Sequence, residues 1–457
     1  METIDDPYLR HLFDGEPVFN VYNKQATNLS VGAPGPDLLQ HCVGMIKKAT
    51  DHRLEAEKKE GKYYLFQYGI TAGLWECREE LAKFLTRRYG DPVKRENLIL
   101  TCGASHGLQL LLNTVLSPNG VIFVEEVTYM IALDAFKQFP LMRIVPIPMK
   151  NDIVDLNAFE KVLAEEKQNG NFLTNEQKIF WAMFYTIPTF HNPTGTTLPP
   201  ASCKRLVEIA RRNSIMVVCD DVYNLLYYGD GFPPRRLFSY DDPTDPEYKG
   251  GHVVSNGSLS KILSPAIRFG WIECSPRVAN IFKTSGILRS GGAVNHYVSG
   301  VVTSLLQLNI QENYLDKLIQ IYKERLSVLC SVLDRCLPQC CSYQRPEGGY
   351  FVWIHLPLGN TICFHRRLFD VITEIYNTKW KFNLFIDING SDFIKWCQKE
   401  YKVSAIPGIQ FSYLGRSHNF LRLSIGFHRK EVLEAAVKTL CKALLEYINK
   451  NNDCTKS

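Results

Sequence analysis

Short β-rich runs alternate with segments of helical spacing between about residues 95 and 290. Segments 108–116, 131–139 and 203–212 carry apolar residues at the spacing of a helix face. Alternation of this kind predicts an α/β large domain, in which a mostly parallel sheet is sandwiched by helices. The expected strands are 98–101, 121–125, 143–147, 179–186, 215–219, 252–254 and 269–274.

The pattern changes after about residue 305, which predicts a second, smaller α+β domain. We expect three parts: an N-terminal segment, 1–45, that joins the small domain, a large domain, 46–304, and a small C-terminal domain, 305–457. The elements expected in the last part are helices at 314–337 and 430–448, a strand at 349–354 and two further apolar segments at 403–406 and 420–425. Residues 229–251, rich in Pro, Asp and Gly, are expected to form a surface excursion of the large domain.

Composition narrows the possible partners and the compartment. The 457 residues are 45% hydrophobic and 22% charged, and the net charge of +5 is not gathered into a basic block, so we expect no nucleic-acid partner. No apolar run reaches the roughly 20 residues that span a bilayer. The acidic start of the chain does not resemble a mitochondrial leader, and the 14 cysteines show no Cys-x-x-Cys pairs. We therefore expect a cytoplasmic protein with reduced, mostly buried thiols, and no metal site.

One lysine stands among hydroxyl residues near an arginine, in the segment from Ser258 through Ser260 and Lys261 to Arg268. A lysine amine forms a Schiff base with an aldehyde once burial or a neighbouring cation favours its neutral form. Hydroxyl groups and a guanidinium are suitable donors to phosphate oxygens. The segment therefore predicts a site for pyridoxal phosphate (PLP), although Ser-x-Ser-Lys also occurs in plain surface turns.

Two acidic residues close an apolar strand, and Tyr223 follows them. A carboxylate facing a pyridine nitrogen keeps that nitrogen protonated, which makes the ring an electron sink, and Asp220 is the candidate. Tyr223 is placed to donate to the ring oxygen. The alternative is that Asp220 and Asp221 cap the next helix.

Other candidates also follow expected strands. Asn192 precedes a proline and a glycine turn, and its amide can donate to the ring oxygen; a plain turn is the alternative. Ser105 opens an expected helix, where backbone N–H groups and its hydroxyl form a phosphate seat or simply a helix cap. His106 beside it has no catalytic role, and Tyr129 either stacks on the pyridine or belongs to the core.

Arg422 lies inside an apolar strand pattern, where an unpaired charge is costly. A buried guanidinium binds a carboxylate with two parallel hydrogen bonds, and the α-carboxylate of a substrate is one such group. An internal salt bridge is the competing interpretation.

Taken together, these motifs resemble those of the fold-type I PLP-dependent aminotransferases of class I/II. Within them, the chain is similar to the branch of kynurenine and 2-aminoadipate aminotransferases and of the aminotransferase domains of MocR-type regulators. The matching segments span about residues 28–427 and are 66–68, 72–74, 103–106, 191–195, 220–223, 258–261, 268–271, 290–295, 346–350 and Arg422. Two departures are a longer connection at about 357–390 and His106, which replaces a commoner neutral residue.

The resemblance implies a role for each matched residue. Lys261 binds PLP covalently, and Asp220 pairs with the ring nitrogen. The implied cofactor ligands are Ser105, His106, Tyr129, Asn192, Tyr223, Ser258, Ser260 and Arg268, with Tyr68 reaching the phosphate across a homodimer interface. The implied substrate ligands are Arg422, Gly32 and Asn192, with Arg422 receiving the α-carboxylate.

The expected reaction is ping-pong transfer of the amino group of an L-amino acid to a 2-oxo acid, with Lys261, Asp220 and Tyr223 as catalytic residues. A PLP-dependent lyase that carries out β-elimination is one alternative, because one fold serves several reactions. A non-catalytic PLP-binding protein is the other. A MocR-type regulator is disfavoured because the cofactor pattern begins near residue 28. The identity of the amino acid stays open among kynurenine, 2-aminoadipate, aromatic and branched-chain compounds.

Overall fold

The computed structural model describes residues 26–292, 295–358 and 387–454. The chain divides into two compact units. The larger unit consists of residues 33–321 and 346–349, and the smaller unit of residues 1–32, 322–345 and 350–457. The domain boundaries expected at residues 45 and 304 stay a prediction. Residues 293–294 of the 290–295 motif and most of the connection at 357–390 lie outside the described residues.

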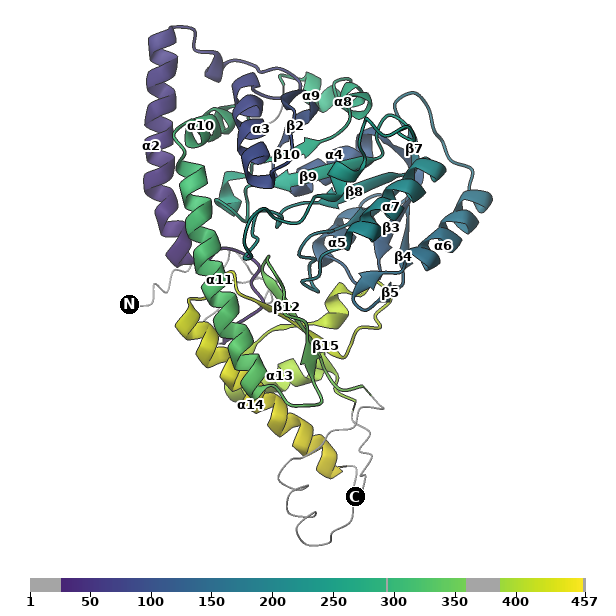
Figure 1. Cartoon of the computed structure of the whole chain (residues 1–457), viewed down its shortest axis with the longest axis vertical. Helices are drawn as coiled ribbons and strands as arrows, with labels where there is room; N and C mark the ends of the chain where they lie inside the picture. The colour runs from purple at the N-terminus through teal and green to yellow at the C-terminus, as the bar shows by residue number, and fades with distance from the viewer. Residues whose placement is uncertain (1–25, 293–294, 359–386, 455–457) are drawn as a thin grey trace. The chain divides into compact units, whose positions relative to one another are not determined.

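The larger unit is built on a seven-stranded sheet with the order β2-β10-β9-β8-β7-β3-β4 (Figure 1). The strands from β9 to β4 run parallel, and β10 runs antiparallel to both of its neighbours. Their bounds are β2 (Leu98–Thr101), β3 (Leu116–Glu125), β4 (Arg143–Ile147), β7 (Phe180–Thr186), β8 (Met216–Asp220), β9 (Val253–Ser258) and β10 (Gly270–Glu273). Each of the seven expected runs is a strand of this sheet, and the predicted α/β class is confirmed.

Helices cover the sheet, and strands buried on both faces explain the continuous apolar runs. The helices are α2 (Pro36–Glu60), α3 (Trp75–Tyr89), α4 (Ala104–Thr114), α5 (Met130–Lys137), α6 (Leu156–Asn169), α7 (Pro200–Asn213), α8 (Pro276–Phe282), α9 (Gly286–Arg289), α10 (His296–Gln307) and the part of α11 (Ile310–Cys336) up to Ile321. Short elements complete the unit: η1 (Tyr64–Phe66), η2 (Arg95–Asn97), β5 (Met149–Lys150), β6 (Ile153–Val154), η3 (Leu237–Tyr240) and η4 (Pro265–Ile267).

One face of the sheet packs against α6 and α7. Phe123, Phe184 and Val217 of the strands form a single buried cluster with Phe159 of α6 and Leu206 of α7. Phe123 and Phe184 both lie against the Phe159 ring, with ring centroids 5.3 and 4.8 Å apart. Truncating such a buried aromatic to alanine costs about 3–5 kcal/mol. This packing holds β3, β7 and β8 side by side and so fixes where their carboxyl ends lie.

The smaller unit is a separate α+β structure, as the sequence predicts. Its four-stranded sheet has the order β11-β12-β15-β14, and all neighbouring strands are antiparallel. The bounds are β1 (Thr27–Asn28), β11 (Ser342–Tyr343), β12 (Phe351–His355), α13 (Gly390–Tyr401), β13 (Val403–Ser404), β14 (Ile406–Pro407), η5 (Gly408–Phe411), β15 (Phe420–Ser424) and α14 (Lys430–Cys454). The strand β1 pairs in parallel with β13.

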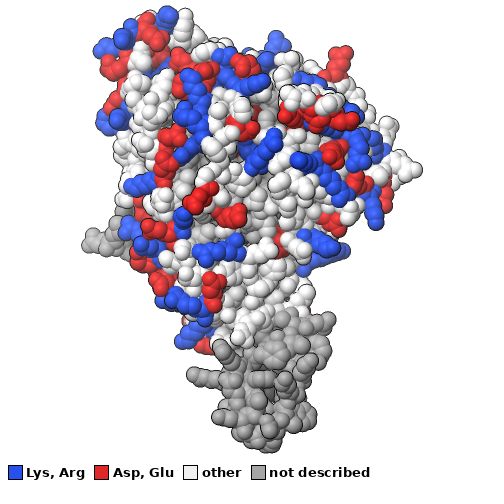
Figure 2. Space-filling view, viewed as in Figure 1, with Lys and Arg blue, Asp and Glu red and all other residues white. Residues whose placement is uncertain are grey.

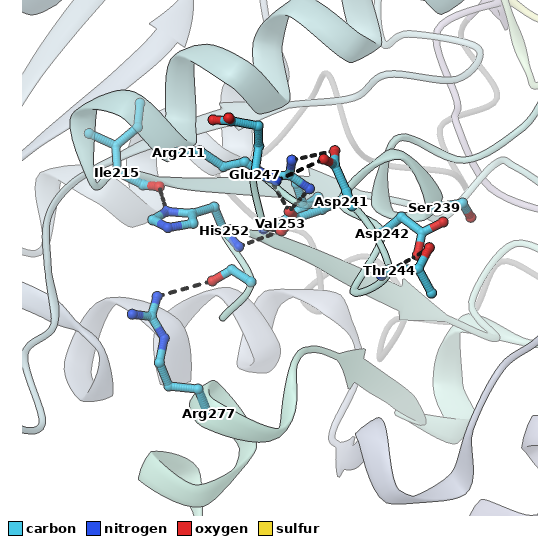
Figure 3. A network of polar contacts seen from close by, with 12 residues as sticks. Arg211, Ile215, Ser239, Asp241, Asp242, Thr244, Glu247, His252, Val253 and Arg277 are labelled. Carbon is cyan, nitrogen blue, oxygen red and sulfur yellow. Dashed lines mark hydrogen bonds and ion pairs between the residues drawn. The ribbon is translucent and has the colours of Figure 1, made fainter. Parts of the chain in front are cut away.

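The expected excursion at 229–251 is anchored by buried polar contacts (Figure 3). The Asp241 carboxylate accepts hydrogen bonds from Arg211 Nε at 2.9 Å, Val253 N at 3.0 Å and His252 N. The His252 ring contacts the Ile215 carbonyl through Nδ1 at 2.9 Å. Burial lowers the pKa of His252, so the ring is neutral at pH 7. Asp241 therefore ties the middle of the excursion to α7 and to the start of β9.

The cysteines and the charges qualify two of the expectations. Eleven cysteines of the described ranges are free thiols, and most of them are buried. Cys340 is disulfide-bonded, so the expectation of reduced thiols is wrong at that position.

On the face seen in Figure 2, Lys and Arg lie interspersed with Asp and Glu. No helix in the described part of the chain is both long and apolar enough to cross a membrane.

Candidate active site

The candidate cofactor residues of the larger unit follow the carboxyl ends of parallel strands. Ligands bind at this edge in open α/β sheets, because the turns that leave parallel strands converge there. Ser105 lies after β2, Tyr129 after β3, Asn192 after β7, Asp220 at the end of β8, and Ser258 and Lys261 at and after the end of β9. Since β3, β7, β8 and β9 are consecutive in the sheet, these residues lie along one edge.

The Asp220 carboxylate is buried, and one of its two oxygens accepts a hydrogen bond. Its Oδ2 accepts a hydrogen bond from the Tyr185 hydroxyl at 2.6 Å. Its Oδ1 is buried and has no hydrogen-bond partner among the described residues. Burial raises the pKa of Asp220 to about 6, while the Tyr185 hydrogen bond and the charge of Lys261 act in the opposite direction. The carboxylate is therefore charged at pH 7 and presents a free acceptor oxygen beside Lys261.

Lys261 lies in a tight turn that leaves β9. Leu263 N donates to the Leu259 carbonyl at 2.8 Å, and Leu259 N donates to the Phe269 carbonyl at 3.1 Å. The side chain of Lys261 is half-buried, and its charge acts on the Asp220 carboxylate. The predicted anchor lysine and the predicted partner of the ring nitrogen are thus brought together.

Hydroxyl groups of the same turn contact each other. The Oγ atoms of Ser258 and Ser260 are 2.9 Å apart, and Ser260 N donates to Ser258 Oγ at 3.1 Å. Because either hydroxyl can turn outward, the pair offers donors to an anion that arrives next to it.

Arg268 reaches the turn that precedes α4. Its Nη2 donates to the Cys102 carbonyl at 3.3 Å, and a Cβ built on Gly103 would lie 2.9 Å from that same nitrogen. Gly103 also has a φ of +85°, which favours glycine. A Cβ on Gly270 would lie 2.8 Å from the Gly103 Cα, so the two backbones touch. This close approach places the Arg268 fork over the first turn of α4, where Ser105 is exposed.

The backbone of Arg268 is itself held from a distance. Its φ of +49° is unusual for a residue with a side chain. The Asn295 amide Nδ2 donates to the carbonyls of Arg268 at 2.8 Å and Ile267 at 3.2 Å. Asn295 therefore fixes the turn from which the guanidinium projects.

His106 is engaged by its own helix terminus. Its Nδ1 accepts a hydrogen bond from Cys102 N at 3.2 Å, and burial lowers the pKa of the ring. A neutral His106 that accepts through Nδ1 carries its proton on Nε2. The ring steadies the turn before Ser105.

Asn192 is buried in a turn that is held in place by contacts of the neighbouring His191. His191 N donates to the Thr196 carbonyl at 2.8 Å, and the Asn192–Pro193 peptide bond is cis. The His191 ring contacts Glu125 Oε2 through Nε2 at 3.1 Å and Thr194 Oγ1 through Nδ1 at 2.9 Å. The turn is thereby tied to the end of β3, which fixes the direction of the Asn192 side chain.

The helix-cap interpretation of the two aspartates is wrong. No α-helix of the described residues follows β8 directly, and Asp221 accepts instead from the Ser255 hydroxyl of β9. Burial raises the pKa of Asp221. Tyr223 is buried in the segment after it. Asp221 therefore joins two strands and leaves Asp220 as the carboxylate of the site.

Two further tyrosines differ in exposure. Tyr129 is half-buried directly before α5 and lies near enough to Tyr185, which contacts Asp220, to contribute to the raised pKa of that phenol. Tyr68 is 82% exposed, and a Cβ on Gly291 would lie 2.6 Å from its ring. Tyr129 thus lies on the Asp220 side of the sheet edge, whereas Tyr68 presents most of its surface outward.

The predicted substrate residues Arg422 and Gly32 belong to the smaller unit. Arg422 is buried in β15, and its Nη2 donates to the Ser30 carbonyl at 2.6 Å. The rings of Phe351 and Phe411 lie 4.1 and 4.8 Å from the guanidinium carbon. A Cβ on Gly32 would lie 2.9 Å from the Phe351 ring, so the 30–32 segment packs on the same aromatic wall. Arg422 is a preorganised guanidinium between aromatic faces.

The larger unit fits a phosphate-bearing pyridine aldehyde. Asp220 Oδ1 is a buried acceptor beside a lysine, as a protonated ring nitrogen requires. Arg268, the serine pair and the start of α4 offer hydrogen-bond donors to a phosphate. The arrangement can hold such a group at both ends and bring a lysine amine to its aldehyde.

Three residues that hold the candidate site in place were not predicted from the sequence. Tyr185 stood inside an expected apolar strand, Glu125 ended another, and Asn295 appeared only within a matched motif. The signal for Tyr185 and Glu125 was polarity at the carboxyl end of a buried strand. No local signal marks Asn295, because it acts on a backbone 27 residues away.

Comparisons with known proteins agree with this geometry. The family model described as "Aminotransferase class I and II" matches residues 24–440. "Aromatic-amino-acid aminotransferase 1" of Thermococcus litoralis is 30% identical over 342 residues, which cover 74% of this chain and 76% of that protein. The "2-aminoadipate transaminase" of Thermus thermophilus is 27% identical over 419 residues, which cover 90% and 88%. A crystal structure of Pyrococcus horikoshii kynurenine aminotransferase with PMP, KYN and KYA has a TM-score of 0.74 and 25% identity, covering 97% of this chain and 95% of that one. The matched range contains every candidate residue named above.

Proposed function

Since the chain belongs to the class I and II aminotransferases, it is a PLP-dependent enzyme that transfers amino groups from amino acids to 2-oxo acids, and we propose that Lys261, Asp220 and Arg422 carry this reaction. When bound, PLP supplies an aldehyde that bonds to an amine and a ring that accepts electron density. The observation that carries the proposal is the buried Asp220 Oδ1, which has no partner among the described residues and lies beside Lys261.

The proposed roles of the large unit follow from its contacts. Asp220 would hold the ring nitrogen of PLP protonated, and Lys261 would bind the aldehyde carbon and serve as the base that moves the α-proton of the substrate. Asn192 and Tyr223 would donate to the ring hydroxyl, and Tyr129 would pack against the ring. The proposed phosphate ligands are Ser105, Ser258, Ser260 and Arg268, with His106 steadying the turn at Ser105.

Arg422 is proposed to receive the substrate α-carboxylate. The packing of Phe351 and Phe411 on its guanidinium excludes water and fixes the orientation of its fork. Gly32 is proposed as a substrate-side residue of the same unit, because its lack of a side chain lets the 30–32 segment lie against Phe351. Asn192 is proposed as a third substrate ligand.

The proposed amino donor is an L-amino acid with an aromatic side chain, kynurenine included. The support is that two of the relatives above are named for such substrates. The purified protein, loaded with PLP, is mixed with single amino acids without any 2-oxo acid, and its absorbance is recorded. Aromatic donors should convert the lysine-bound cofactor to the pyridoxamine form. Conversion by 2-aminoadipate or branched-chain donors alone contradicts the aromatic proposal.

The lyase alternative is tested in the same samples. Release of pyruvate and ammonia without an added 2-oxo acid identifies β-elimination. Amino transfer leaves a stoichiometric 2-oxo acid and stops until a second 2-oxo acid is supplied, which gives ping-pong kinetics.

We also propose a homodimer, in which Tyr68 of one copy reaches the phosphate site of the other. The support is a surface of exposed apolar residues, namely Tyr63, Tyr64, Phe66, Tyr68, Ile70 and Trp75. Gly69 N donates to the Gly291 carbonyl at 2.7 Å, so this surface continues onto the 286–292 segment. Exposed apolar area of this kind marks an interface with another chain. Sedimentation at micromolar concentration should give a dimer, and a monomer contradicts the proposal.

A cytoplasmic location is proposed as well. The support is that eleven cysteines of the described residues are free thiols, as in a reducing compartment, whereas Cys340 is disulfide-bonded. Imaging of the full-length tagged chain tests it.

A further inference from the structure

Tyr185 is a polar residue inside a fully buried strand of the larger unit. The strand β7 is buried throughout, and the exposed fraction of Tyr185 is zero. Its hydroxyl donates to Asp220 Oδ2 at 2.6 Å. The expected functions leave this tyrosine without a role, although it contacts the central carboxylate of the site directly.

The strand register produces this contact. Tyr185 pairs with Val218 across β7 and β8, and Asp220 follows Val218 by two residues. Because side chains alternate between the faces of a strand, Val218 and Asp220 point to the same face as Tyr185. The tyrosine ring is long enough to span this diagonal. A shift of one residue in the register would remove the contact.

The position of the phenol is fixed on its other side as well. The Phe136 ring of α5 meets the Tyr185 ring edge-on, with centroids 5.3 Å apart and an interplanar angle of 76°. On the neighbouring strand, Val124 of β3 pairs with Tyr185. Burial and the Asp220 charge raise the pKa of Tyr185 well above its usual value, so the hydroxyl keeps its proton and always acts as the donor.

The contact has two consequences for Asp220. The hydrogen bond from Tyr185 holds Oδ2 in place, so the orientation of the carboxylate is restricted and Oδ1 points in one direction. It also favours the charged form, because a hydrogen bond to a carboxylate lowers its pKa against the effect of burial. Without the phenol, Asp220 would rotate freely and would be harder to ionise.

We propose that Tyr185 is a positioning residue of the amino-transfer reaction, which acts through Asp220 by fixing Oδ1 toward the ring nitrogen of PLP and by keeping the carboxylate ionised. This inference rests on the proposed role of Asp220. It assigns a function to a residue that touches neither the substrate nor the cofactor.

The test compares Tyr185→Phe with a matched control. Tyr343→Phe removes another phenol that donates to a carboxylate, that of Asp334 at 2.5 Å, in the smaller unit. PLP is added back to the cofactor-free full-length protein, and its dissociation constant is measured by fluorescence between pH 5 and 8. We expect Tyr185→Phe to weaken PLP binding about tenfold at pH 7, the loss expected for one hydrogen bond to a charged group. Tyr343→Phe should bind as the wild type does.

The pH dependence gives a second readout. Wild-type affinity should rise as the pH passes the pKa of Asp220 at about 6, because the charged form binds the ring nitrogen. Tyr185→Phe should move this midpoint upward, since the hydrogen bond that favours the carboxylate is lost. The other ionisable groups that act on the pair are Asp221 and Lys261 at Asp220, and Tyr129 and Glu125 at Tyr185. They are unchanged in the variant, so a shift of the midpoint reports on Tyr185.

Two outcomes separate the inference from the proposal beneath it. If Tyr185→Phe keeps wild-type affinity and midpoint while Asp220→Asn loses affinity, the role of Tyr185 is refuted and that of Asp220 stands. If Asp220→Asn also binds PLP as the wild type does, the proposed role of Asp220 fails first. Should Tyr185→Phe not fold, 3-fluorotyrosine at position 185 keeps the ring and strengthens the donor. It should move the midpoint downward, and an unchanged midpoint contradicts the inference.

Discussion

Removing the carboxylate of Asp241 should destabilise the larger unit severely. The Asp241 side chain is only 3% exposed, and it accepts from Arg211 and from two backbone N–H groups at the start of β9 (Figure 3). Asp241→Ala leaves the guanidinium of Arg211, whose side chain is 5% exposed, with Asp245 as its remaining carboxylate partner among the described residues. The two N–H groups lose their acceptor in the same step.

The magnitude follows from these contacts. Breaking a buried ion pair by removing one partner costs about 3–5 kcal/mol, and unsatisfied buried donors add to that cost. Asp245 is 38% exposed and keeps one contact to Arg211, so we expect a value near the lower end, about 3 kcal/mol. In a domain of this size, this corresponds to a fall in the melting temperature of about 5 °C.

Thermal melts of the cofactor-free protein, followed by far-UV circular dichroism, measure this effect. Asp242→Ala is the matched control, because the neighbouring carboxylate accepts only from Thr244 among the described contacts. Hydrogen exchange at the amides of His252 and Val253 locates the change at the start of β9. A melting temperature of Asp241→Ala within error of Asp242→Ala would refute the reasoning.

Three further predictions concern the site itself. Lys261→Ala should abolish both the covalent retention of PLP and turnover. Gel filtration followed by absorbance measures the retention, and a coupled assay measures the turnover. Retained turnover would contradict the proposed role of Lys261 as the residue that binds PLP covalently. Burial holds the pKa of Asp220 at about 6, above the value of 3.8 of an unperturbed aspartate, so the wild type loses stability relative to Asp220→Asn as the pH rises through that window. Melts of both cofactor-free proteins at stepped pH should show a relative gain for the variant on the order of 3 kcal/mol between pH 4 and 6.5, whereas a constant difference contradicts the pKa. Gly270→Ala places a Cβ against the backbone of Gly103, so it should cost about 1–3 kcal/mol and weaken PLP binding, while Gly286→Ala, with no atom within 4 Å, should do neither.

The positions of the central strands along the chain follow from their burial, because such strands need apolar side chains on both faces. That requirement is visible in the sequence, and it explains why the run 179–186 coincides with the fully buried strand β7. The candidate residues of the larger unit were found because polar groups at the ends of such runs stand out. Asp220 is the clearest example, since it ends a run that is apolar up to Cys219.

Contacts between segments far apart in the sequence could not be predicted from local sequence patterns. A tyrosine within an apolar run is usually a residue of the hydrophobic core. Only the pairing register of the strands shows that Tyr185 reaches Asp220. The alternative in which Asp220 and Asp221 cap a helix failed because Asp221 is claimed by Ser255 of the next strand. Asn295 holds Arg268 through a turn whose backbone geometry no composition reveals. These are tertiary effects, and they override local preference.

The proposed phosphate ligands come from distant parts of the chain, and this has a consequence for the stability of the protein. They and the residues that hold them lie at 102–105, 258–268 and 295, and these segments meet only in the folded chain. An unfolded chain therefore offers PLP nothing to bind beyond a lysine amine. A ligand that binds the folded state alone stabilises it by about 2.7 kcal/mol at 100 times its dissociation constant. The cofactor should therefore affect the stability of the folded enzyme as well as its activity.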